Sequence, residues 1–179
     1  MTDKMSLASK VQNRVAAGGR VSCRNKDAVI GAVIKYLDKN CVLTVYHLLK
    51  IGKCGLGDIV KVEGWVGKVL EIIMDLDLAV IEINTPEAPL VFSILAEPHI
   101  GPAYALKGSS KNPCRIMTVG RTYHYLAFPF STIPLPGDSG SPIIQEGRIV
   151  GILASVFYNN ATGIAVALKR FQSGMTEND

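Results

Sequence analysis

The chain has 179 residues, of which 48% are hydrophobic and 19% are charged, and its formal net charge is +4. These proportions describe a globular chain that can bury a core, and they exclude an intrinsically disordered one. No apolar run reaches the length of a membrane span, and the polar start lacks the pattern of a secretory signal peptide. Short β-like runs separated by glycine, proline and asparagine predict an all-β class.

The first part of the chain supplies a histidine and two aspartates at strand ends. After residues 1–20, interpreted as a loosely attached leader, the apolar run Cys41–His47 predicts a buried strand that ends at His47. Asp77 directly precedes the apolar run Leu78–Ile83. Asp75 is two residues earlier and would face the same side of an extended strand. Asp77 is favoured because the apolar run starts directly after it, and Asp75 stays open as the alternative.

The second part of the chain carries a serine in a glycine turn. Residues 84–89 have linker composition and divide the chain into units at 21–89 and 90–171, followed by a flexible tail at 172–179. The second unit contains Gly137-Asp138-Ser139-Gly140-Ser141-Pro142. Its glycines allow positive φ, which presents the Ser139 hydroxyl and exposes backbone N–H groups beside it. A serine nucleophile needs a base. His47 fits this role, whereas His99 in a turn and His124 in a strand are interpreted as structural.

Three motifs in this order carry a family resemblance. Thr44-Val45-Tyr46-His47, Asp77-Leu78-Ala79-Val80 and the Ser139 hexapeptide resemble the motifs of chymotrypsin-like (trypsin-fold) serine proteases, over roughly residues 20–170. The resemblance implies two six-stranded antiparallel β-barrels with the active site between them. It also implies a catalytic His47, Asp77 and Ser139, an oxyanion hole formed by the N–H groups of Gly137 and Ser139, and no metal or cofactor.

The resemblance also points to residues that bind substrate. The strand around Ala154, Ser155 and Val156 would pair with a peptide backbone. The pocket for the residue before the cleaved bond would have apolar or small walls, namely Ile133, Pro134, Ala154 and Ala165. Binding of an acidic side chain through Arg121, Lys169 or Arg170 stays an open alternative. Trypsin-type members have an acid six residues before the nucleophile. Ile133 stands there in this chain and disfavours cleavage after Lys or Arg. Ala154 stands where many members have a serine that supports the catalytic acid.

The cysteines bear on the cellular setting. Leu48 follows His47, where secreted relatives place a cysteine that closes the histidine loop. We therefore expect reduced thiols at Cys23, Cys41, Cys54 and Cys114 and an intracellular location, with a bridge between Cys41 and Cys54 as the open alternative.

Asp138 narrows the type of protease. Secreted relatives pair this acid with a freed N-terminus that begins Ile-Val-Gly-Gly. This chain has no such start, so Asp138 must find another partner or stay solvated. Together with separations of 30 residues from His47 to Asp77 and 62 from Asp77 to Ser139, this resembles small viral polyprotein-processing proteases of the astrovirus or arterivirus type.

The predicted function is therefore serine endopeptidase, with a viral polyprotein as substrate and the host-cell cytoplasm as location. One alternative is a housekeeping protease of the HtrA type. Another is a protease fold used as an RNA- or protein-binding module. The mild basic cluster Lys107, Lys111 and Arg115 leaves a nucleic-acid partner open without supporting it.

Overall fold

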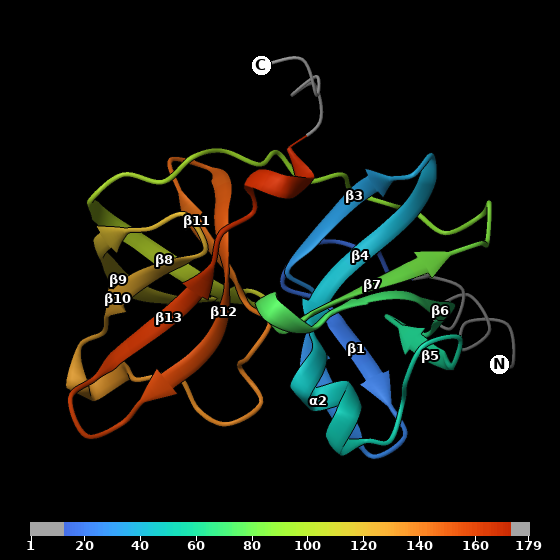
Figure 1. Ribbon diagram of the computed structural model, residues 1–179, viewed down its shortest axis with the longest axis horizontal. Coiled ribbons are helices and arrows are strands. Elements are labelled where there is room, and N and C mark those ends of the chain that lie inside the picture. The colour runs from blue at the N-terminus through green and yellow to red at the C-terminus, as the bar shows by residue number, and fades with distance from the viewer. Residues whose placement is uncertain (1–12, 173–179) are drawn as a thin grey trace, which may run out of the picture.

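The computed structural model describes residues 13–172 of the chain. In this part the strands form two antiparallel units that lie side by side, with short helices between and beside them (Figure 1). The all-β, two-barrel prediction is confirmed. No helix within residues 13–172 is long and apolar enough to cross a membrane.

The first unit is a sheet of seven strands in the order β2-β1-β5-β6-β7-β4-β3. They are β1 (Arg20–Cys23), β2 (Lys26–Val29), β3 (Ala32–Tyr36), β4 (Lys39–Val45), β5 (Ile59–Val62), β6 (Trp65–Ile73) and β7 (Leu78–Ile83). The two edge strands, β2 and β3, follow one another in the chain and are separated only by Ile30 and Gly31. The sheet therefore has seven strands instead of the predicted six, because one stretch of chain is divided into β2 and β3. The sheet curls, because these two consecutive strands form its opposite edges.

The second unit is a closed barrel of six strands in the order β10-β13-β12-β11-β8-β9. They are β8 (Gly101–Lys107), β9 (Ser110–Val119), β10 (Tyr123–Ala127), β11 (Pro142–Gln145), β12 (Arg148–Phe157) and β13 (Thr162–Val166). The described helices are α2 (Tyr46–Ile51) and the 3₁₀ turns η1 (Met74–Leu76), η2 (Phe130–Thr132) and η3 (Lys169–Phe171).

The unbroken apolar run of β7 is explained by burial on both faces of the strand. Ala79 and Ile81 point into the core of the first unit. Leu78 and Val80 point the other way, into a second core that they share with Ile152 of the second unit. Because side chains alternate along a strand, one strand contributes to both cores. The core between the units holds the two halves of the site together.

The chain segments at the unit boundary are longer and better packed than predicted. Residues 84–100 join the units, and Ser93 in this segment exchanges two hydrogen bonds with the backbone of Val33, of 2.8 and 2.9 Å. Val15 is fully buried and forms a bridge with Leu90. The leader predicted over residues 1–20 is therefore wrong for residues 15–20, which pack on the first unit. Residues 1–12 and 173–179 lie outside the described residues.

The cysteines differ from the sequence-based expectation. Cys23 and Cys54 form a disulfide, whereas Cys41 and Cys114 are free and buried. The open alternative failed because Cys41 faces the core between the units, while Cys23 and Cys54 both face the core of the first unit. Burial raises the pKa of the Cys41 thiol to about 11. The disulfide joins β1 to the loop that follows α2, the helix that carries His47.

Candidate active site

His47 lies at the start of a helix and not, as predicted, at the end of a strand. Strand β4 ends at Val45 and α2 begins at Tyr46. The strand still fixes the position of the histidine, because Val45 pairs with Leu78 of β7. The Tyr46 N–H donates to the Asp77 carbonyl over 2.8 Å. The β4–β7 register therefore places the first turn of α2 beside Asp77.

The Asp77 carboxylate makes two hydrogen bonds to one residue. Its Oδ1 accepts from the backbone N–H of His47 over 2.8 Å, and its Oδ2 lies 2.6 Å from His47 Nδ1. The carboxylate accepts, so Nδ1 carries the proton, and Nε2 is left as the nitrogen that can take up another. Asp77 itself ends η1 in a left-handed conformation, with φ 52°. The carboxylate thus sets both the orientation and the tautomer of the ring.

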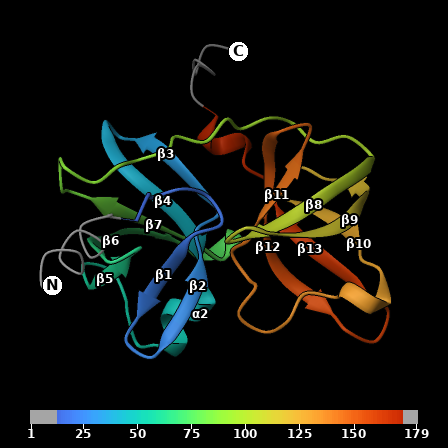
Figure 2. The ribbon, with the colours of Figure 1, turned by 180° about the vertical axis from the view of Figure 1, so that it is seen from behind.

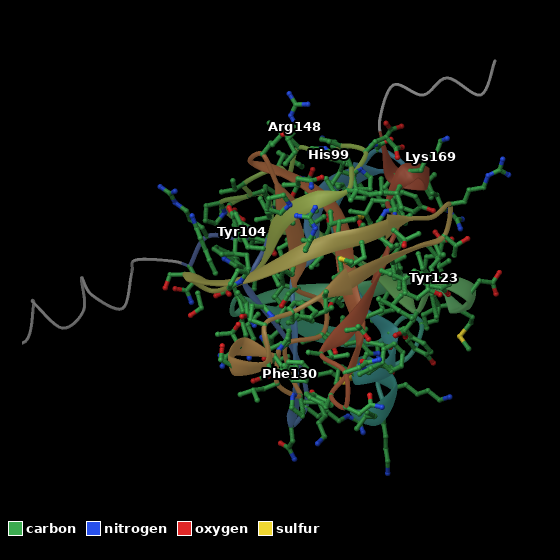
Figure 3. All side chains as sticks on the ribbon, turned by 90° about the vertical axis from the view of Figure 1, so that its left-hand side faces the viewer. His99, Tyr104, Tyr123, Phe130, Arg148 and Lys169 are labelled. Carbon is green, nitrogen blue, oxygen red and sulfur yellow. A yellow bond between two sulfur atoms is a disulfide. The ribbon has the colours of Figure 1, made fainter. Side chains whose placement is uncertain are left out.

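The alternative acid, Asp75, lies elsewhere. Residues 74–76 form the 3₁₀ turn η1 instead of an extended strand, so Asp75 and Asp77 do not share a face. The Asp75 side chain is exposed, and its backbone carbonyl accepts from the Tyr123 hydroxyl over 2.6 Å. Figure 3 shows Tyr123 at the end of its strand, close to the green segment that carries η1. The structure brings Asp77, and not Asp75, to the histidine.

Ser139 lies in a turn bounded by two glycines with positive φ. Gly137 and Gly140 both have φ 96°. The turn is closed by hydrogen bonds from the Asp138 N–H to the Leu135 carbonyl and from the Ser141 N–H to the Asp138 carbonyl. The N–H groups of Gly137 and Ser139, predicted to form the oxyanion hole, donate to no acceptor within residues 13–172. Both groups are therefore available to a ligand.

The serine turn rests directly on the first unit. The Ser139 carbonyl accepts from the Val29 N–H over 3.3 Å. A Cβ on Gly140 would lie 2.4 Å from the Val29 carbonyl oxygen, and one on Gly31 would lie 2.9 Å from the Gly140 carbonyl oxygen. Thr44, three residues before His47, donates to the same Val29 carbonyl over 2.7 Å. Two glycines, one from each unit, thus allow Ser139 to approach the segment that is tied to the histidine strand.

The Ser139 hydroxyl and the His47 ring, both in the described part of the chain, are not hydrogen-bonded to one another. Such contacts are often long in the absence of substrate and shorten in the reacting complex. Both side chains are accessible to a substrate, because Ser139 is half-buried and the His47 side chain is 37% exposed.

Asp138 finds the partner that the sequence left undetermined. Its Oδ1 accepts from Lys107 Nζ over 2.8 Å, and its Oδ2 accepts from the Leu135 N–H over 2.7 Å. No spacing in the sequence points from Asp138 to Lys107, which was placed in a basic cluster instead. Within that cluster, Lys107 is paired with Asp138, and Lys111 Nζ lies 5.0 Å from the centre of the Tyr104 ring.

The predicted substrate strand has a free edge. Strand β12 pairs with β11 only as far as Ile152, whereas it pairs with β13 as far as Phe157. Among residues 13–172, therefore, no strand pairs with Ala154–Val156 on the side of the serine turn, where an extended peptide can add by backbone hydrogen bonds. Ala154 is buried in the core between the units, so its methyl group offers no polar support to Asp77.

The side chains predicted to wall the pocket are uncharged. Ile133 is half-buried, and Pro134 and Ala154 are buried. Sequence reasoning did not select Phe128, which is buried and lies 3.0 Å from the position of a Cβ on Gly163. Gly163 pairs with Val156 of the candidate substrate strand. Phe128 belongs to the core of the second unit and packs behind this strand.

The other histidines lie away from Asp77. His99 is exposed and its backbone N–H donates to Gln145, whereas His124 is 2% exposed and its Nδ1 accepts from the Gly120 N–H over 3.2 Å. Burial lowers the pKa of His124. No group of three His, Cys, Asp or Glu side chains among residues 13–172 could hold a metal ion.

Comparison with known proteins places the fold. No protein-family model matches the chain, and no curated protein matches it. Its structure is similar to Nocardiopsis protease (TM-score 0.71, 12% identity, covering 88% of this chain and 94% of that chain). It is also similar to Thermobifida fusca protease A, with a TM-score of 0.70 and 13% identity, over 90% of this chain and 95% of that chain. A third similar structure is a glutamic acid specific serine protease, with a TM-score of 0.68 and 13% identity, over 87% of this chain and 95% of that chain. The chain therefore has the two-barrel, chymotrypsin-like fold of these serine proteases.

Proposed function

We propose that the chain is a serine endopeptidase that cleaves peptide bonds through an acyl-enzyme. One observation carries the proposal: the Asp77 carboxylate holds His47 by two hydrogen bonds at the boundary where the Ser139 turn meets the first unit. A nucleophile, a base and a group that orients the base are the parts that acyl transfer by serine requires.

The reaction proceeds in two halves. Ser139 Oγ attacks the carbonyl carbon while His47 Nε2 takes its proton, and Asp77 stabilises the imidazolium. The N–H groups of Gly137 and Ser139 bind the oxyanion. The C–N bond then breaks, His47 returns the proton to the leaving amine, and the acyl group stays on Ser139. Water, deprotonated by His47, attacks this ester and releases the acid and the free hydroxyl.

The substrate is a polypeptide whose residue before the cleaved bond is uncharged. The candidate walls Ile133 and Pro134 support this, because neither side chain carries a charge. The glutamic acid specific relative uses a histidine triad in substrate binding. This chain has three histidines in all, and Asp77 engages one of them, so a separate triad cannot be assembled.

The biological role that we propose is processing of a viral polyprotein in the host-cell cytoplasm. Support comes from the short separations between the three motifs and from Lys107, a lysine side chain that pairs with Asp138. Because Cys23 and Cys54 form a disulfide, the cysteines do not support the intracellular location. The test is cleavage of a precursor containing the sequences that flank this chain in its gene. Cleavage of other proteins but not of those junctions contradicts this role.

A fluorophosphonate probe tests the enzymatic proposal, because it reacts with activated serines. We expect it to label the wild-type chain and the Ser131→Ala variant, whose changed residue is an exposed serine outside the site. Ser139→Ala is expected to remain unlabelled. The absence of labelling in a folded wild-type sample contradicts the proposal, and so does labelling of Ser139→Ala.

A further inference from the structure

We infer that the second unit carries a binding cavity for a small carboxylate, separate from the candidate active site. The cavity has a volume of about 220 Å³ and is lined by residues 96–98, by the turn from β9 to β10, and by residues 167–172. Val150, near the start of β12, completes the wall, whereas the candidate substrate stretch Ala154–Val156 lies nearer the other end of that strand. No proposed catalytic or substrate-binding residue lines the cavity, so the inference does not depend on the peptidase function.

His124 is the buried polar side chain of this cavity. Its neighbours on β10, Tyr123 and Tyr125, are exposed on the outer face, so His124 faces inward and is only 2% exposed. Its Nδ1 accepts from the Gly120 N–H, so the proton of the neutral ring lies on Nε2. Nε2 is buried and has no hydrogen-bond partner within residues 13–172. A buried N–H without an acceptor is rare and costly, and an oxygen of a ligand would supply one.

The histidine ring is held on two sides. The Gly120 N–H fixes Nδ1, and a Cβ on Gly151 would lie 3.5 Å from His124 Cδ2, so the backbone of β12 packs close to the ring. Gln172, on the opposite side of the sequence, adds an acceptor. Its Oε1 is buried and accepts from no donor in the described part of the chain. The cavity therefore contains one unused donor and one unused acceptor.

The charged side chains of the cavity favour a single negative charge on the ligand. Arg121, Lys169 and Glu97 line it and are all exposed, which gives two cations and one anion, a net charge of +1. A guanidinium binds a carboxylate through two parallel hydrogen bonds. A phosphate dianion fits less well, because it brings a second negative charge near Glu97 and has no donor for Gln172.

The size and the apolar part of the wall limit the ligand further. A volume of about 220 Å³ is below the roughly 300–1,000 Å³ of sites that hold drug-sized molecules. Apolar side chains make up much of the remaining wall, among them Val119, Val150 and Leu168. A carboxylate with a short apolar group and an N–H that donates to Gln172 satisfies all of these groups. An N-acyl amino acid has this chemistry, either free or as the C-terminal residue of a peptide.

The cations that the sequence left open for an acidic substrate side chain lie at or near this cavity. Figure 2 shows the segment between the units, in yellow-green, passing beside the short red helix η3 at the top of the molecule. Lys169 begins η3 and lines the cavity, and Figure 3 labels it there. Arg170, the next residue, pairs instead with Glu71 of the first unit over 3.6 Å. Arg170 is therefore a matched control for Lys169.

Calorimetric titration of the Ser139→Ala chain tests the inference without turnover of the ligand. We expect N-acetylalanine to bind and N-acetylalanine amide, which lacks the carboxylate, not to bind. Butyrate, which lacks the amide N–H, is expected to bind more weakly than N-acetylalanine. A tripeptide that ends in a free alanine distinguishes the two sources: its binding shows that the end of a peptide enters the cavity, and binding of N-acetylalanine alone assigns a free acyl amino acid.

Variants of the exposed charges locate the bound ligand. We expect Arg121→Ala and Lys169→Ala each to raise the Kd of N-acetylalanine by about tenfold or more, because each removes a charged donor. Glu97→Gln removes the opposing charge and should lower the Kd by about two- to fivefold. Arg170→Ala should leave it within about twofold. All four side chains are exposed, and thermal unfolding checks that each variant is folded.

Proton NMR reports on the buried group itself. We expect the Nε2–H signal of His124, identified by its absence in His124→Gln, to move downfield as N-acetylalanine binds. The inference is overturned if none of the carboxylates binds at millimolar concentration, which leaves water as the only occupant. It is overturned equally if Arg121→Ala and Lys169→Ala bind like wild type, if the amide binds as well as the acid, or if inorganic phosphate binds more tightly than N-acetylalanine. An inactive wild type that binds N-acetylalanine in this way overturns the proposed function alone.

Discussion

Replacement of Asp77 by asparagine tests the geometry of the site most directly. The carboxylate accepts from both the backbone N–H and the Nδ1–H of His47. An asparagine has one acceptor oxygen and one donor amide. If the oxygen faces the backbone N–H, the amide meets Nδ1 and forces its proton onto Nε2, which can then no longer accept from Ser139. If the side chain is reversed, the amide meets the backbone N–H, and two donors oppose one another.

The expected loss of activity follows from this mismatch. The wrong tautomer in a serine-protease triad lowers kcat by about 10⁴-fold, which corresponds to about 5.5 kcal/mol in the activation free energy. Asp75→Asn is the matched control, because the Asp75 side chain is exposed and only its backbone carbonyl is engaged, by Tyr123. We expect Asp75→Asn to retain activity within about threefold. The measurement is kcat/KM on a peptide substrate selected from a library, with thermal unfolding as a control for folding.

Two results would refute this reasoning. Activity of Asp77→Asn within tenfold of wild type would show that the two hydrogen bonds do not determine the state of His47. A loss in Asp75→Asn as large as that in Asp77→Asn would show that the η1 turn, and not the Asp77 carboxylate, is what matters.

Four further predictions follow from particular contacts. Gly140→Ala places a Cβ 2.4 Å from the Val29 carbonyl at φ 96°, so urea unfolding is expected to show a loss of about 2–5 kcal/mol, against about 1 kcal/mol for Gly137→Ala, which meets open space. Tyr123→Phe removes the hydrogen bond to the η1 turn and should lower kcat/KM by about three- to tenfold, while Tyr125→Phe, exposed on the same strand, should not. Cys54→Ser opens a disulfide between residues 31 apart and should lower the free energy of unfolding by about 3 kcal/mol, whereas Cys41→Ser breaks no bridge. If dithiothreitol destabilised wild type and Cys54→Ser equally, the disulfide would not be the source of this stability. Burial lowers the pKa of His124 in the folded chain. As pH falls below about 6.5, the unfolded chain therefore takes up a proton on this histidine before the folded chain does, and the free energy of unfolding should decline. The decline should be smaller in His124→Gln.

The sequence predicts the parts of the site that depend on local pattern. Leu78–Ile83 was predicted as a strand, and β7 has these bounds. An apolar run before His47 and another after Asp77 were enough to predict strands that bring the two residues near one another. This works because both strands are buried on two faces, which makes their apolar character continuous and easy to recognise.

The parts that the sequence left undetermined depend on contacts between distant segments. The η1 turn cannot be distinguished from a strand extension in the sequence, so Asp77 is favoured only by its place directly before an apolar run, and Asp75 stays open until the turn separates the two side chains. The pairing of Lys107 with Asp138 joins the end of β8 to the serine turn, and these two segments share no periodic pattern. The sequence predicts thiols at Cys23 and Cys54 because no cysteine follows His47 directly. The disulfide instead uses Cys54, which lies after the helix that carries His47.

The two halves of the site are fixed in different ways. The orientation of His47 depends on Asp77 and on the β4–β7 register, so it is set within the first unit. Ser139 and its N–H donors are set by the turn around Asp138, which belongs to the second unit. What brings the halves together is the close approach of Gly31 to Gly140, with the shared core behind it. The distance between nucleophile and base therefore depends on how the two barrels pack, because neither barrel alone contains both.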